Sequence, residues 1–191
     1  ITTFTAGSGS VIYNGAVAQQ IFAGTYFNLV TQTSNQIRTI QGNVTVNNDL
    51  TITLGTFNFG NVLRTVTVSG NLSSAGTIDM SGGSVAHVLN LGGVTNTMVT
   101  LTTAAAASVI NYNRAGDQSV FANANYRNLT ISGSGNKIMQ GNVSVGGIAT
   151  FNVAGCSLVI NGNTLFLNNG TAGSNGTITG SPTSNIVITG N

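Results

Sequence analysis

The chain has 191 residues, of which only 4% are charged and 41% are hydrophobic, and its formal net charge is +2. Disorder usually requires low hydrophobicity and high charge, so this composition argues against a disordered chain. The five basic residues are scattered, which gives no nucleic-acid footprint. No run approaches the ~20 apolar residues of a membrane helix, so no membrane insertion is expected.

The segment 42–61 shows the pattern of the chain most clearly. Three groups of apolar residues alternate with Thr or Asn: Val44 and Val46; Leu50, Ile52 and Leu54; and Phe57 and Phe59. Side chains on a strand point to opposite faces with a period of two. The breaks between the groups carry Asn, Asp or Gly, which tolerate tight turns. The segment therefore predicts three short strands with one apolar side, which is one coil of a β-solenoid.

Further short strands are predicted along the rest of the chain, each rich in β-forming residues and bounded by Gly, Asn or Ser. They are 64–68, 77–80, 85–91, 98–101, 128–132, 148–153, 158–160, 165–167, 177–179 and 186–189. The alanines at 104–107 are too few to nucleate a lasting helix. No segment shows helical spacing over about ten residues.

The chain also repeats itself after about 100 residues. Phe22 and Phe121 are 99 residues apart, and Tyr26 and Tyr126 are 100 residues apart. We therefore expect one continuous β-solenoid over 1–191 that contains two sequence repeats, 10–107 and 108–191. Neither end resembles the polar cap of a repeat array, which predicts a fragment of a longer array.

The expected fold is all-β, a right-handed parallel β-helix with about 20–25 residues per coil. Coils stacked at the strand spacing of about 4.8 Å would give a rod roughly 40 Å long. Asn and Thr that recur at one turn position could hydrogen-bond from coil to coil. Tandem immunoglobulin-like sandwiches are the alternative, because such domains contain about 100 residues. The very short strands and the lack of Trp and of a Cys pair favour the solenoid.

Catalytic and metal-binding residue types are scarce. The only acids, Asp49, Asp79 and Asp117, are separated and lie in turn-like contexts. Polysaccharide-cleaving enzymes need two carboxylates on one site. His87 has no acid or Cys beside it and is interpreted as a strand residue, and Cys156 as a small buried residue. No catalytic, metal or cofactor site and no cofactor is predicted.

The four tyrosines, Tyr13, Tyr26, Tyr112 and Tyr126, recur at matching positions of the two repeats. They have two interpretations: they fill a wide part of the core, because aromatic residues carry the largest apolar area, or they contact ligands such as sugars at the surface. Thr-x-Thr pairs, such as Thr51 with Thr53, also suggest ice binding. The same pairs form the polar side of any strand.

Two runs, VIYNGAVAQQIFAGTYFNL (11–29) and GNVTVNNDLTI (42–52), resemble repeats of very large surface adhesins of gliding bacteria that use the type IX secretion system. They are also similar, more loosely, to the β-helical repeats of filamentous haemagglutinin-type adhesins. The resemblance implies a secreted, extracellular, non-enzymatic stalk or filament at the cell surface. Its partners would be neighbouring repeats of a longer chain, with self-association or surface glycans as further contacts. A carbohydrate- or ice-binding module is the alternative function.

Overall fold

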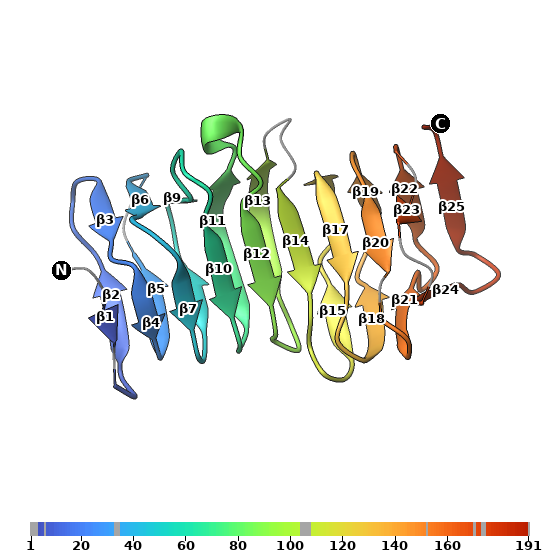
Figure 1. Cartoon of the computed structure of the whole chain (residues 1–191), viewed down its shortest axis with the longest axis horizontal. Helices are drawn as coiled ribbons and strands as arrows, with labels where there is room; N and C mark the ends of the chain where they lie inside the picture. The colour runs from blue at the N-terminus through green and yellow to red at the C-terminus, as the bar shows by residue number, and fades with distance from the viewer. Residues whose placement is uncertain are drawn as a thin grey trace.

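The computed structural model describes residues 4–5, 7–32, 35–103, 108–151, 153–169, 171–172 and 175–190. The chain is all-β, with 55% strand, and its strands stack as a β-solenoid of about eight turns. In Figure 1 the coils follow one another along a rod with the two termini at opposite ends. Every strand pairing in the described ranges is parallel. The solenoid prediction is confirmed, and antiparallel sandwiches are excluded.

One face of the rod is a nine-stranded parallel sheet. Its strands, in order, are β1 (Phe4–Thr5), β4 (Gly24–Tyr26), β7 (Val44–Val46), β10 (Thr65–Val68), β12 (Val88–Leu91), β14 (Val109–Tyr112), β17 (Asn128–Ile131), β20 (Ala149–Phe151) and β23 (Thr171–Ala172). The longest coil separates Val66 from its partner Leu89 by 23 residues, and the shortest separates Ile110 from Leu129 by 19. Coils are therefore slightly shorter than expected.

The two other faces share one eight-stranded sheet in the first half of the rod. One side contains β2 (Ser10–Tyr13), β5 (Asn28–Thr31) and β8 (Leu50–Ile52), and the other contains β3 (Gln19–Ile21), β6 (Ile37–Ile40) and β9 (Thr56–Asn58). The long strand β11 (Leu72–Met80) pairs with both β8 and β9, and β13 (Thr97–Thr103) pairs with β11. A register shift between Ser74 and Thr77 lets β11 pass the corner without a turn.

In the second half these two faces are separate four-stranded sheets. One contains β15 (Gln118–Val120), β18 (Gly135–Met139), β21 (Cys156–Val159) and β24 (Thr177–Thr179); the other contains β16 (Asn123–Tyr126), β19 (Val143–Val145), β22 (Thr164–Leu167) and β25 (Asn185–Ile188). The backbone N–H of Ser119 donates to the Val94 carbonyl at 2.8 Å, which keeps β15 on the preceding coil. The one helical element of the described residues is a 3-10 turn, η1 (Gly82–Ser84).

The predicted alternation is confirmed in β7, where Val44 and Val46 are buried and Thr45 lies between them on the outer side. One residue of the pattern was placed wrongly. Leu54 is 52% exposed instead of buried, because β8 ends at Ile52. The chain then turns the corner through Gly55, whose φ of +77° favours glycine. The buried residues of all coils form one continuous apolar cluster.

Side chains at the corners hydrogen-bond to the next coil, as the recurrence of Asn suggested. The Asn28 side-chain oxygen accepts from the backbone N–H of Asp49, the Asp49 carboxylate from that of Asn71, and the Asn71 oxygen from that of Thr95, at 2.8–3.2 Å. These bonds satisfy backbone donors that leave the strands at a turn, so each corner is tied to the coil below it.

The long repeat is not a whole number of coils. Tyr13 lies in β2, on a face of the eight-stranded sheet, whereas its match Tyr112 lies in β14 of the nine-stranded sheet. From β2 the chain makes four coils, through β5, β8, β11 and β13, and then passes two further faces to reach β14. The second repeat is therefore turned by one face relative to the first. The alanines at 104–107 lie outside the described residues.

Candidate functional site

Two of the three acids act as turn residues. The Asp49 carboxylate accepts a hydrogen bond from the backbone N–H of Asn71, and the Asp117 carboxylate accepts one from that of Asn136, both at 2.8 Å. Each acceptor belongs to the coil that precedes its donor. Both acids therefore stabilise the stacking of coils, which is the role predicted for turn-forming Asp.

Asp79 lies on the outer side of β11. One carboxylate oxygen accepts from the backbone N–H and the hydroxyl of Ser81 at 2.9 and 2.6 Å, and the other accepts from the Asn58 amide at 2.7 Å. Both oxygens are thus used within the scaffold. Across the described ranges, no group of three His, Cys, Asp or Glu side chains could hold a metal ion.

His87 is fully buried, but it precedes β12 instead of lying within a strand as expected. Its Nδ1 accepts the backbone N–H of Arg64 at 3.2 Å, so the ring proton is on Nε2. Nε2 donates to the carbonyl oxygens of Gly60 and Gly82, at 3.1 and 3.3 Å. The ring also packs on Phe59 with centroids 5.3 Å apart. Both nitrogens serve the fold, which leaves neither for catalysis.

The tyrosines of the second repeat form a buried network. The hydroxyls of Tyr112 and Tyr126 are 2.8 Å apart, Tyr126 donates to the Phe121 carbonyl at 2.7 Å, and the Phe121 N–H donates to the Tyr112 hydroxyl at 3.1 Å. Both side chains are fully buried. Burial raises the pKa of Tyr112 to about 12 and raises that of Tyr126 as well, so both stay neutral.

The first repeat contains the same network. The Tyr13 and Tyr26 hydroxyls are 3.2 Å apart, Tyr26 donates to the Phe22 carbonyl at 2.8 Å, and the Phe22 N–H donates to the Tyr13 hydroxyl at 3.3 Å. Tyr26 is buried, and Tyr13 is half-buried in the first coil. The expectation of ligand contacts is therefore corrected for Tyr26, Tyr112 and Tyr126, whose rings cannot present a face to a sugar. The core interpretation applies to them.

A buried cation occupies one position of both repeats. Lys137, on β18, is fully buried, and its ammonium donates to the carbonyl oxygens of Arg114, Gly116 and Ser134 at 2.8, 2.8 and 2.6 Å. Burial lowers the pKa of Lys137, because desolvation penalises the charged form. The three carbonyls surround the ammonium and leave no room for a substrate contact.

Arg38, on β6, precedes Lys137 by 99 residues and is also buried. Its guanidinium donates to the carbonyls of Gly15 and Val17 at 2.6 and 3.1 Å. Sequence reasoning missed both cations because it treated the basic residues as scattered. The available signal was the shared repeat position, which aligns Arg38 with Lys137.

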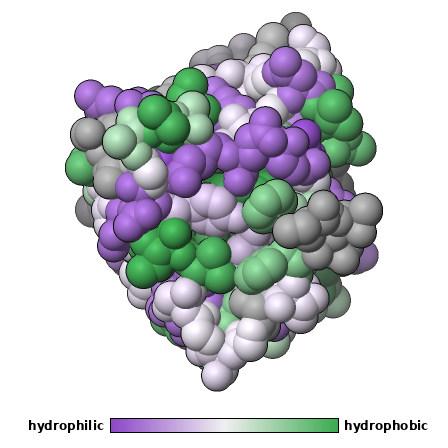
Figure 2. All heavy atoms as spheres, turned by 90° about the vertical axis from the view of Figure 1, so that its left-hand side faces the viewer, coloured by the Kyte–Doolittle hydropathy of each residue, from purple (hydrophilic) through white to green (hydrophobic). Residues whose placement is uncertain are grey.

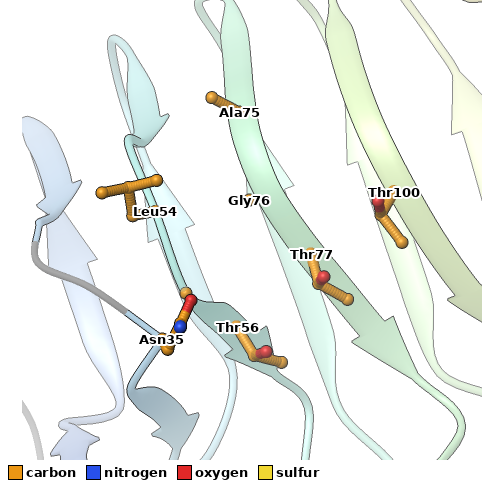
Figure 3. A pocket seen from close by; sticks show the side chains of 8 residues that line it. Asn35, Leu54, Thr56, Ala75, Gly76, Thr77 and Thr100 are labelled. Atoms are coloured by element: carbon orange, nitrogen blue, oxygen red, sulfur yellow. The ribbon is translucent and has the colours of Figure 1, made fainter.

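The outer surface has one hollow, at the corner where β8 leads into β9 (Figure 3). Small and hydroxylated residues line it: Asn35, Leu54, Gly55, Thr56, Ala75, Gly76, Thr77 and Thr100. Thr77 is in register with Thr56 on one side and Thr100 on the other. The hollow thus contains a row of hydroxyls at the strand spacing of about 4.8 Å.

A second polar row runs beside this one on the same face. Asp79 is in register with Asn58 on one side and with Thr102 on the other. The two rows form a face of hydrogen-bonding groups across β9, β11 and β13, and no aromatic residue lines the hollow. Such a face can bind an ordered hydroxylated surface, but it lacks the aromatic platforms that stack sugar rings.

No family model, curated protein or solved structure matches the chain. Within the part of the chain that the structure describes, no helix is long and apolar enough to cross a membrane. The arguments on function therefore rest on the geometry of the rod and its surfaces.

Proposed function

We propose that the chain is a structural repeat segment of an extracellular bacterial adhesin, a stalk or filament segment without a catalytic role. The observation that carries the proposal is the nine-stranded parallel sheet, which runs from β1 to β23 in an unbroken order. One apolar cluster extends beneath it from Leu29 in β5 to Leu167 in β22. A rod with a continuous core and continuous backbone pairing is suited to hold two points at a fixed distance.

The energetics of stacking favour a stiff rod over a string of separate coils. Each buried Val, Leu, Ile or Phe stabilises the fold by roughly 1.5–3 kcal/mol, and ordering each residue costs about 1–2 kcal/mol. A single coil of about twenty residues buries too few apolar side chains to offset that cost alone, so its stability depends on its neighbours. Bending the rod would separate coils and expose the core.

The rod proposal is tested by small-angle X-ray scattering on the purified chain, with controlled proteolysis beside it. A rigid rod roughly 40 Å long is expected from about eight coils. Trypsin should leave most of the chain intact, because two of its five basic residues, Arg38 and Lys137, are buried. Scattering typical of a flexible chain would reject the spacer role.

The cellular part of the proposal rests on the resemblance to adhesin repeats. Extracellular localisation, export by type IX secretion and a longer chain of neighbouring repeats are expected together. An antibody against the rod should label intact cells of the source organism, and surface proteolysis should remove that label. Labelling that requires lysed cells would reject the adhesin role but not the rod.

A second candidate function is a binding module for carbohydrate or ice, which the in-register Thr56, Thr77 and Thr100 favour. The test compares a Thr77→Lys and Thr100→Lys double variant with Thr45→Lys, which changes the nine-stranded face instead. A glycan array and an ice-partition assay separate the two ligands. Loss of binding in the double variant alone would support this candidate, and no binding by the unaltered chain would reject it.

A further inference from the structure

The two ends of the rod carry no charge. All Asp, Lys, Arg and His residues of the chain lie between Arg38 and Lys137, so 1–37 and 138–191 contain none. The strands that terminate the sheets are β1, β2 and β3 at one end and β23, β24 and β25 at the other. Proteins usually protect such edge strands with charged side chains, with bulges or with a covering element. Charged side chains are absent from both of these edges.

The C-terminal edge exposes core-type residues. Ile186 and Ile188 of β25 are in register with Leu165 and Leu167 of β22, which point into the core and are buried. Ile186 is nevertheless 46% exposed and Ile188 64% exposed. Figure 2 looks onto the opposite, N-terminal end, where hydrophobic residues are exposed among polar ones. Val11 of β2 is only half-buried there.

The chain itself contains a template for what fits the C-terminal edge. Thr77–Ile78 of β11 matches Thr177–Ile178 of β24 at a separation of 100 residues, so the next strand, β12, corresponds to β25. Within the rod, β12 is covered by β14. Strand β14 in turn corresponds to β2, because it carries Tyr112, the match of Tyr13. By this correspondence, β2 has the pattern of a strand that pairs with β25.

We propose that the rod binds a second copy of itself head to tail, with β2 of one copy on β25 of the next and β1 on β24. In the register of β12 with β14, Leu89 lies opposite Ile110 and Leu91 opposite Tyr112. The same register places Val11 opposite Ile186, and Tyr13 opposite Ile188. The copies are rotated by one face relative to each other, as the two repeats are within the chain.

Two features favour this occupant and this orientation. Head-to-tail contact keeps the strands parallel, which is the pairing used throughout the rod, whereas head-to-head contact would make them antiparallel. The contact is also heterologous and does not close, so it generates linear filaments. This inference deepens the proposed filament role and rests on it.

The test uses the 191-residue chain in sedimentation velocity over a wide concentration range, with electron microscopy of the largest species. Growth into linear species is expected. Ile188→Lys and Val11→Lys place a charge in the proposed contact from opposite ends, and each should weaken association by at least about tenfold. The control is Val99→Lys, because Val99 is 68% exposed on β13, away from both ends. This control should associate like the unaltered chain.

A mixture of the two edge variants gives the sharpest result. The Val11→Lys chain keeps its C-terminal edge and the Ile188→Lys chain keeps its N-terminal edge, so equal amounts should form dimers and nothing longer. Circular dichroism confirms that each variant is folded before it is mixed. Dimers support the proposal, and their absence from a mixture of folded variants overturns it.

Two other outcomes also overturn the inference. One is an unaltered chain that stays monomeric at all concentrations, and the other is a Val99→Lys chain that loses association as fully as Ile188→Lys. A monomer that still scatters as a rigid rod would leave the spacer function standing and remove only the self-association. A flexible monomer would remove both.

Discussion

The two tyrosine networks have the same chemistry in different surroundings. In the second repeat, β14 lies between β12 and β17, Tyr112 is fully buried, and the two hydroxyls are 2.8 Å apart. In the first repeat, β2 is an edge strand with β5 on one side only, Tyr13 is half-buried, and the corresponding distance is 3.2 Å. The same residues are therefore held more tightly in the interior of the rod than at its end.

This difference indicates that a coil takes much of its order from the coils on both sides. A residue's contribution to stability should depend on its position along the rod as well as on its position in the repeat. Pairs of matching residues, one near the end and one in the interior, measure that dependence directly.

The largest effect is expected for a charge in the interior core. Ile110→Asp should reduce the free energy of unfolding by more than about 4 kcal/mol, because Ile110 is fully buried and the carboxylate has no partner there. Its match Val11→Asp should instead fray the first coil only. Urea unfolding and hydrogen exchange measure the two effects, with Thr130→Asp on the outer side as a tolerated control. Equal losses at Val11 and Ile110 would contradict the comparison.

Alkaline pH should unfold the rod through its buried tyrosines. Burial raises the pKa of Tyr112 from 10.0 to about 12 and also raises those of Tyr26 and Tyr126. A raised folded-state pKa gives stability that is complete below pH 10 and is lost as the pH rises towards 12, on the order of 3 kcal/mol for Tyr112. Tyrosinate absorbance of these three residues should appear together with loss of the β signal in circular dichroism. Their ionisation in a still-folded chain would contradict this.

An intermediate effect is expected at the buried cation. Lys137→Met removes the donor to three carbonyls and should cost about 2–3 kcal/mol in chemical denaturation. Lys137→Arg should cost less, because the first repeat holds Arg38 at the matching position. If the Arg variant is no more stable than the Met variant, the two cation sites are not equivalent.

The smallest effect is expected for the tyrosine hydroxyls. Tyr112→Phe should cost about 2 kcal/mol, because it leaves buried partners on Tyr126 and Phe121 unsatisfied. Tyr13→Phe should cost less than about 1 kcal/mol, because water can reach its half-buried site. Thermal unfolding of the two variants side by side measures the difference, and the reverse order would show that the edge coil is as tightly packed as the interior.

Local patterns in the sequence predicted much of the fold. Alternation of apolar and polar residues located β7 and β24 with their observed bounds, since both lie in short segments between clear turn residues. The recurrence of Asn at turns anticipated the corner hydrogen bonds. The same pattern failed at Leu54, because alternation continues through a corner in the sequence although the strand has ended.

Features that depend on stacking could not be predicted in this way. The offset of the repeats by one face follows from coil lengths that vary from 19 to 23 residues, and no single coil reveals their sum. The cages around Arg38 and Lys137 are built from carbonyls of neighbouring turns, which the sequence does not place together. The hollow at Thr77 is formed by three successive coils and has no motif of its own.

The offset of the repeats has a consequence for how the rod meets its surroundings. Thr45, on the nine-stranded sheet, and its match Ser144, on the sheet of β19, look outward in different directions around the axis. Any outward group that recurs with the long repeat is thus displayed at a new azimuth in each repeat. A rod built this way needs no particular roll about its axis to bring a copy of that group against a flat support.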